Sequence, residues 1–224
     1  MGTLILIRHG QSQWNLENRF TGWTDVPLTK RGREDAVRCG KALRAYSFDI
    51  AFTSRLLRAT ETLDIILQEC GQTGMSVVQD SALNERHYGD LQGLNKAETA
   101  AKHGAEMVQL WRRSFFTRPP GIDGESMEDC ERRTRPFFTH YMLPHIRSGK
   151  TVISSIHGNS MQPIVKFLEE LEPEAAATLE FGLCTPYVYT FEGETVVHKE
   201  EIAVPGIVTK GASIKEKRVE EGRV

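Results

Sequence analysis

The sequence has little that would place it in a membrane, in a secretion pathway or on a nucleic acid. Its 224 residues contain no apolar run that approaches the roughly 20 residues needed to span a bilayer. The chain begins directly in a short apolar stretch, without the basic segment, apolar core and cleavage site of a secretion signal, so we expect no signal peptide. The formal net charge is only −2, so no global field attracts nucleic acid or acidic lipid. Any anion site must therefore be a local cluster of cations.

Cysteine is also sparse. The four cysteines are widely spaced and form no C-x-x-C pair; they are Cys39, Cys70, Cys130 and Cys184. This spacing argues against a disulfide framework and against a zinc site, and it predicts reduced packing residues in a cytoplasmic protein. A content of 39% hydrophobic and 26% charged residues is typical of a globular domain. We expect one domain over residues 1–204, followed by a polar, charged and mobile tail over residues 205–224.

The most informative stretch is residues 4–15, which reads L-I-L-I-R-H-G-Q-S-Q-W-N. Its first four residues form an unbroken apolar run, which is typical of a strand buried on both faces. That run ends in Arg8 and His9, and donors from Ser12 and Asn15 follow at once. Open α/β sheets bind ligands at the carboxyl ends of their strands, so we expect these side chains to line a crevice.

Residues 150–156 repeat the pattern. They predict a second buried strand, and it ends in His157, Gly158, Asn159 and Ser160. Two strands that both end in His-Gly bring their imidazoles together if the strands are neighbours in the sheet. His9 and His157 are therefore expected to share one site.

The rest of the chain alternates apolar strands with helices. Further strands are predicted over residues 48–53, 75–78 and 186–191. Helix starts are predicted from the N-cap candidates Thr29, Ser54, Asn95 and Ser126, and residues 161–171 are predicted to be helical. The core side of the helix after Ser126 is predicted to carry Phe137, Phe138, Tyr141, Met142 and Ile146. The pattern predicts a single three-layer α/β domain, with a mainly parallel central sheet covered by helices on both faces and a loop-rich lid.

Several polar residues at strand ends and loop starts match the needs of phosphoryl transfer. That reaction requires a nucleophile, cations for the phosphoryl oxygens and an acid for the leaving oxygen. His9 suits the nucleophile, because an imidazole with a pKa near ~6.5 is largely neutral at pH 7. A hydrogen bond from its other ring nitrogen to a backbone carbonyl would fix the reactive tautomer. Arg8 and Arg58 supply cations, since Arg58 falls in the first turn of a helix beside the crevice, and Glu85 supplies the acid.

Several longer strings carry a family resemblance. They are the R-H-G-Q-S-Q-W-N stretch, T-G-W from Thr21, E-R-H-Y-G from Glu85, W-R-R-S from Trp111 and H-G-N-S from His157. The chain resembles the histidine phosphatase superfamily, and the E-R-H-Y-G and W-R-R-S strings are similar to its cofactor-dependent phosphoglycerate mutases. The resemblance covers nearly the whole chain, in order. In two places the chain differs from the usual pattern: Gln11 stands where many members have Glu, and Met161-Gln162-Pro163 replaces a Leu-Arg-Gly or Leu-Arg-Ala string.

The resemblance implies roles for individual residues. His9 would carry the phosphoryl group, Glu85 would donate and accept the proton, and Arg8, Arg58 and His157 would surround the phosphoryl group. The carboxylate and second phosphate of the substrate would be held by Arg86, Tyr88, Lys96, Arg112 and Arg113. The remaining substrate-binding positions would be Gln11, Ser12, Asn15, Thr21, Gly22, Gly158 and Asn159. A bisphosphorylated glycerate carries roughly five negative charges, so a second basic cluster beyond Arg8 and Arg58 makes physical sense.

The implied function is the interconversion of 3-phosphoglycerate and 2-phosphoglycerate in glycolysis and gluconeogenesis, with 2,3-bisphosphoglycerate as the primer and no metal. Two alternatives stay open. One is a phosphatase on the same fold, in which water takes the phosphoryl group from His9. The other is a non-catalytic sensor of phosphate esters, although a sensor needs no nucleophile. The chain lacks the proline-rich insert that the family's long form has after W-R-R-S, so it resembles the short form, and the oligomeric assembly of the long form is not expected of it. The expected state is a monomer or a homodimer.

Overall fold

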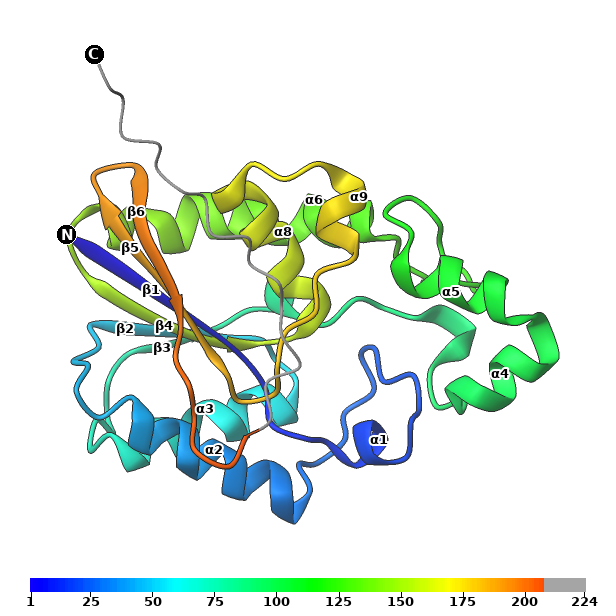
Figure 1. Ribbon diagram of the computed structural model, residues 1–224, viewed down its shortest axis with the longest axis horizontal. Coiled ribbons are helices and arrows are strands. Elements are labelled where there is room, and N and C mark those ends of the chain that lie inside the picture. The colour runs from blue at the N-terminus through cyan, green and yellow to red at the C-terminus, as the bar shows by residue number, and fades with distance from the viewer. Residues whose placement is uncertain (208–224) are drawn as a thin grey trace, which may run out of the picture.

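The computed structural model describes residues 1–207, and a six-stranded sheet forms its centre (Figure 1). The strand order is β3-β2-β4-β1-β5-β6. The strands are β1 (Gly2–Arg8), β2 (Ile50–Thr53), β3 (Val77–Gln79), β4 (Thr151–Ile156), β5 (Pro186–Glu192) and β6 (Thr195–Glu201). The first four are parallel, whereas β5 and β6 are antiparallel to their neighbours. The predicted α/β class with a mainly parallel sheet is confirmed.

The apolar run in β1 explains why this strand lies at the centre. Leu4 and Leu6 are buried in a hydrophobic cluster on one face of the sheet, and Ile5 and Ile7 are buried in a second cluster on the other face. Because successive side chains of a strand point to opposite faces, only an uninterrupted apolar sequence satisfies both. β1 pairs with β4 on one side and with β5 on the other.

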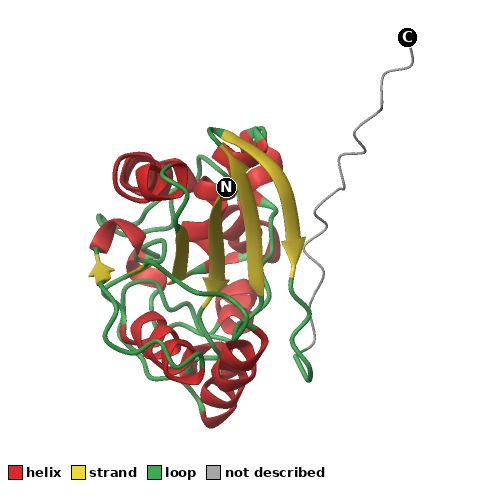
Figure 2. Cartoon of the chain, turned by 90° about the vertical axis from the view of Figure 1, so that its left-hand side faces the viewer, coloured by secondary structure: helices red, strands yellow, loops and turns green. Residues whose placement is uncertain are grey.

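Helices cover both faces of the sheet, as Figure 2 shows from the side. Helices α2 and α3 pack together on the face of Ile5 and Ile7, and α6, α7 and α8 cover the opposite face. The α-helices are α1 (Gln13–Leu16), α2 (Lys30–Ala42), α3 (Leu57–Glu69), α4 (Lys96–His103), α5 (Ala105–Arg113), α6 (Met127–Phe137), α7 (Leu143–Arg147), α8 (Gly158–Glu169) and α9 (Pro173–Ala177). Two 3₁₀ turns, η1 (Ser81–Leu83) and η2 (Gly89–Leu91), and a π-helical segment, η3 (Phe138–Met142), complete the elements.

Helices α4 and α5 form a pair that stands away from the sheet, on the side toward which β1 runs (Figure 1). The segment from α1 to Trp23 is tied to this pair, because a β-bridge joins Arg19 to Asn95. The α4–α5 pair and the segment from α1 to Trp23 therefore lie next to each other, on the side of the sheet toward which β1 runs. Within residues 1–207, no helix combines the length and the apolar composition needed to cross a bilayer.

Three local predictions were wrong. Tyr141 is 62% exposed and does not belong to the core; it lies in η3, whose wider turn shifts the helix face away from the regular spacing. Ser54 does not cap α3, which begins at Leu57 without a side-chain cap. The strand predicted over residues 75–78 is β3, two residues further on. Strand β6 was not predicted, because its alternation includes charged residues and its burial depends on pairing with β5.

The predicted tail over residues 205–224 lies mostly outside the described residues, which end at Ile207. In the described part, Val204 is buried and Ile207 packs against the hydrophobic cluster on the α2 and α3 side of the sheet.

Candidate active site

The two predicted histidines meet at the ends of neighbouring strands. The β1–β4 register places Arg8 beside Ile156, so the next residues of the two strands are His9 and His157. Their ring centroids are 5.0 Å apart and both side chains are buried. The repeated strand–His-Gly pattern therefore builds one site.

His9 is held in a defined tautomer. Its Nδ1 lies 2.7 Å from the carbonyl oxygen of Gly10, and a carbonyl can only accept, so Nδ1 carries the proton. Nε2 is left with a lone pair, which faces Nε of Arg58 at 3.3 Å. The backbone here allows no side chain at position 10, because a Cβ on Gly10 would lie 2.5 Å from the carbonyl oxygen of Gly32. The predicted hydrogen bond that fixes the reactive tautomer is confirmed.

Burial lowers the pKa of His9 well below its usual value of 6.5, and the charges of Arg58 and Arg8 lower it further. A lowered pKa keeps the imidazole neutral as the pH falls through 6.5, so the nucleophile stays available under mildly acidic conditions. We expect a nitrogen-detected NMR titration of the free protein to give a midpoint for His9 below pH 6.5, with Nδ1 as the protonated nitrogen. The His9→Ala spectrum assigns the signal. A midpoint at or above 6.5 would contradict this geometry.

Arg58 and Arg8 approach the imidazoles from different elements. Arg58, in the first turn of α3, is buried and donates to the carbonyl oxygens of Gly22 at 2.8 Å and Thr24 at 3.1 Å. Burial lowers its pKa to about 10, which leaves it charged at neutral pH. Arg8 donates from Nη1 to the Phe181 carbonyl at 3.0 Å, while its buried Nε has no partner. Two cations thus border the nucleophile, and one of them keeps a free donor.

His157 also has a ring nitrogen without a partner. Its Nε2 lies 2.7 Å from the Ser54 hydroxyl, which itself accepts the Leu56 N–H. Its Nδ1 is buried and makes no hydrogen bond. Ser54 orients the second imidazole in place of the capping role that its position predicted. Burial and the nearby Arg58 lower the pKa of His157 well below 6.5.

Glu85 is held at the N-terminus of α8. Its Oε1 accepts the Asn159 backbone N–H at 3.2 Å, the Asn159 side-chain amide at 2.9 Å and the Arg86 N–H at 2.9 Å. All of these bonds go to Oε1, so the other oxygen, Oε2, is the one that can exchange a proton. The N-terminal end of the α8 dipole also favours a carboxylate here.

A pocket of about 480 Å³ lies above these residues. Its lining includes many of the predicted site residues, namely Arg8, Gln11, Asn15, Thr21, Gly22, Glu85, Tyr88, Lys96, Arg112, Arg113, Gly158 and Asn159. His9, Arg58 and His157 are buried next to this lining. The cations Lys96, Arg112 and Arg113 of this lining come from α4 and α5, whereas Arg8 lies at the end of β1. The pocket lining therefore takes its cations both from the strand ends and from the α4–α5 pair.

Two predicted binding residues do not belong to the pocket lining. Ser12 is buried and caps α1 by accepting the Asn15 N–H at 3.2 Å. Arg86 is buried as well, and its Nη2 donates to the carbonyls of Trp111 and Arg112 at the end of α5 and to the Tyr88 hydroxyl. Arg86 thus connects the Glu85 segment to the helix that carries Arg112 and Arg113.

The pocket lining also includes residues that the sequence did not single out. Arg19 and Phe20 come from the loop after α1, and Glu180 pairs with Arg113 at the pocket edge. No local motif marks Arg19, Phe20 and Glu180, because each reaches the pocket through tertiary packing. Gln162, by contrast, belongs to the Met161-Gln162-Pro163 string that departs from the family pattern. It is buried in the pocket wall and donates to the Leu179 carbonyl at 2.8 Å.

Comparison with known proteins agrees with this geometry. A profile of the histidine phosphatase superfamily (branch 1) matches residues 4–201. The chain is 50% identical to the 2,3-bisphosphoglycerate-dependent phosphoglycerate mutase 2 of Gloeobacter violaceus, over 87% of this chain and 88% of that one. It is 47% identical to the 2,3-bisphosphoglycerate-dependent phosphoglycerate mutase of Rhizobium rhizogenes, over 90% and 95% of the two chains. The solved structure of a mycobacterial glucosyl-3-phosphoglycerate phosphatase is 27% identical, with a TM-score of 0.74 over 85% and 93%.

Proposed function

The chain belongs to branch 1 of the histidine phosphatase superfamily, and we propose that it is a phosphoglycerate mutase that interconverts 3-phosphoglycerate and 2-phosphoglycerate in glycolysis and gluconeogenesis. The mutase names of relatives at 47–50% identity support this reaction. The structural observation that supports it most directly is that Lys96, Arg112 and Arg113 line the same pocket as Arg8 and Glu85. A substrate with anionic groups at both ends fits such a pocket.

The chemistry follows from the positions of the residues. Nε2 of His9 attacks the phosphorus of a phosphate ester, so that an N–P bond forms while the P–O bond to the ester oxygen breaks. Arg8 and Arg58 neutralise the charge of the phosphoryl oxygens, and His157 lies beside them as a neutral imidazole. Glu85 gives a proton to the leaving oxygen, and in the reverse direction it takes the proton from the hydroxyl that accepts the phosphoryl group.

The proposed reaction uses 2,3-bisphosphoglycerate as its primer, and the residues in and beside the pocket fit this molecule. The buried Nε of Arg8 and Nδ1 of His157 lack hydrogen-bond partners, which suits one phosphoryl group. Arg112, Arg113 and Lys96 suit the second phosphate and the carboxylate. When bound, the primer supplies the phosphoryl group that His9 carries.

A phosphatase is the competing function, because the same residues could pass the phosphoryl group to water. The deciding experiment measures mutase and phosphatase turnover on one preparation, with and without 2,3-bisphosphoglycerate. The proposal expects mutase turnover to dominate and to depend on the bisphosphate. Hydrolysis faster than isomerisation under both conditions would refute it.

Activity is expected to survive a chelator. Arginine and imidazole side chains can neutralise a phosphate without an ion, and within residues 1–207 no group of three or more His, Cys, Asp and Glu side chains is arranged to hold a metal. We expect the mutase rate with 2,3-bisphosphoglycerate to stay within about twofold after treatment with EDTA. Loss of activity that manganese or magnesium restores would overturn this prediction.

We also propose the partners, the location and the oligomeric state of the enzyme. Its partners would be small phosphoglycerates, with no nucleic acid or membrane, and it would act in the cytoplasm as a monomer or a homodimer. Residues 1–204 would form the catalytic domain, with residues 205–224 as a tail.

A further inference from the structure

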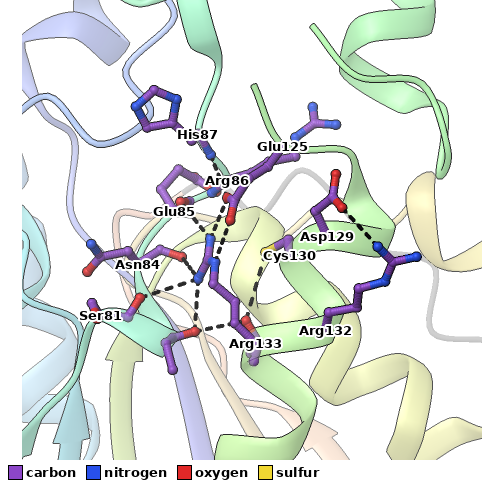
Figure 3. Close-up of polar contacts among 12 residues, drawn as sticks. Ser81, Asn84, Glu85, Arg86, His87, Glu125, Asp129, Cys130, Arg132 and Arg133 are labelled. Atoms are coloured by element: carbon purple, nitrogen blue, oxygen red, sulfur yellow. Dashed lines mark hydrogen bonds and ion pairs between the residues drawn. The ribbon is translucent and has the colours of Figure 1, made fainter. Parts of the chain in front are cut away.

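Arg133 of α6 is not part of the pocket lining, yet it contacts the backbone of the segment that carries Glu85 (Figure 3). Its Nη1 donates to the carbonyl oxygens of Ala82 and Asn84, each at 2.9 Å, and its Nη2 donates to the carbonyl oxygen of Glu85 at 2.9 Å. One guanidinium therefore binds three carbonyl groups within residues 82–85.

Glu125 holds that guanidinium in place. Its two carboxylate oxygens accept from Nε and Nη2 of Arg133 at 2.7 and 2.8 Å, in a two-point ion pair whose side chains are only 19% and 17% exposed. Glu125 also accepts the backbone N–H of His87 at 2.8 Å. The Arg133–Glu125 pair therefore makes hydrogen bonds to the backbone both before Glu85, at Asn84, and after it, at His87.

The backbone around Glu85 depends on side-chain hydrogen bonds. Residues 85–87 lie between the 3₁₀ turns η1 and η2, so the hydrogen bonds of those turns do not support their backbone. Buried carbonyl groups need donors, and charged donors in two-point geometry are the strongest that a side chain offers. Trp23 adds one more, since its Nε1 donates to the Glu85 carbonyl at 2.5 Å and the Arg133 guanidinium lies 5.5 Å from its ring centre.

We propose that Arg133, held by Glu125, is a positioning residue that fixes the backbone beneath Glu85 and thereby aims its carboxylate at the oxygen that gains or loses the proton. The inference rests on the proposed function, in which Glu85 exchanges that proton. A displacement of a reacting group by about 1 Å can cost on the order of 10²-fold in rate. Arg133 acts through Glu85 and does not itself contact the substrate pocket.

The test compares Arg133→Met with Arg132→Met on the full chain. Arg132 is the next residue of the same helix, but it is exposed and pairs with Glu128 and Asp129. We expect Arg133→Met to lower kcat for 3-phosphoglycerate by about 10- to 100-fold while KM changes less than about threefold, because the substrate-binding cations stay in place. Arg132→Met should leave both constants near those of the wild type.

A double-mutant cycle separates positioning from general damage. If Arg133 acts through Glu85, then Arg133→Met should add less than about twofold to the loss already caused by Glu85→Gln. Arg133→Lys keeps the positive charge and the aliphatic part of the side chain but loses the planar guanidinium, which makes the two-point contacts. Its kcat should therefore lie between those of the wild type and Arg133→Met. Should Arg133→Met fail to fold, Arg133→Lys and Glu125→Gln enter the same cycle in its place.

The outcomes are distinct. Equal losses from Arg133→Met in the wild-type and Glu85→Gln backgrounds would overturn the inference, and so would a large rise in KM with kcat unchanged. Wild-type turnover is measured first. Absence of mutase turnover in the wild type would refute the proposed function, whereas an active wild type with a fully active Arg133→Met variant would refute only the positioning role.

Discussion

His9→Ala is expected to abolish phosphoryl transfer, with a loss of at least about 10⁴-fold in kcat. The reason is geometric. Nδ1 of His9 is committed to the Gly10 carbonyl, so Nε2 is the free nucleophilic atom, and it faces the Arg58 guanidinium. No other side chain of the described residues combines a neutral nucleophilic nitrogen with these cations, apart from His157, whose Nε2 is occupied by Ser54. The measurements are the mutase rate and the incorporation of labelled phosphate from 2,3-bisphosphoglycerate.

The fold should tolerate this change. The His9 side chain lies at a strand end beside a polar pocket, and water can replace its hydrogen bond to Arg58, so the free energy of unfolding should change by about 1 kcal/mol or less. The wild-type protein should carry an acid-labile, base-stable phosphohistidine. His198→Ala is the matched control, because His198 is exposed on β6. Label on a serine, or label that survives His9→Ala, would show that another residue carries the phosphoryl group.

The sequence was sufficient to predict the centre of the site because local rules govern it. Residues 4–7 form an apolar run, and residues 152–156 combine Val152, Ile153 and Ile156 with two small serines. Both stretches are buried strands that lead to a His-Gly pair. Burial on both faces places such strands inside a sheet, so the two patterns predicted that His9 and His157 would meet if their strands were neighbours. The β1–β4 pairing in the structure meets that condition.

Long-range contacts could not be predicted in this way. Ser54 has the residue type and position of a helix cap, but its partner His157 lies 103 residues further along the chain. Arg133 stands in a run with Arg132 and Arg135, and no local feature shows that it alone turns inward. Arg86 belongs to the E-R-H-Y-G string that resembles the family, yet its side chain binds the end of α5. A motif identifies a residue as part of a site without stating what its side chain contacts.

Glu85→Gln should lower kcat by about 10² to 10⁴-fold, the usual range for loss of a positioned proton donor and acceptor. The amide keeps the size of the side chain, and its oxygen can still accept from Asn159 and from the Arg86 N–H, so the local structure should persist. His9 should still be found phosphorylated after long incubation with the bisphosphate. A phosphate ester with a good leaving group, such as p-nitrophenyl phosphate, needs no proton donor, so its transfer to His9 should be affected by less than about tenfold.

This leaving-group dependence distinguishes Glu85 from Tyr88, the other proton-bearing side chain beside it. The Tyr88 hydroxyl accepts from Asn159 at 3.3 Å and from Arg86 at 3.1 Å. Burial raises the pKa of Tyr88, but the Arg86 charge and these hydrogen bonds outweigh burial and lower it, so Tyr88 is the competing proton donor. Tyr88→Phe should nevertheless keep kcat within about tenfold of the wild type. A Glu85→Gln variant within a few-fold of the wild type, together with a Tyr88→Phe variant that loses its rate on phosphoglycerates but not on p-nitrophenyl phosphate, would transfer the proton role to Tyr88.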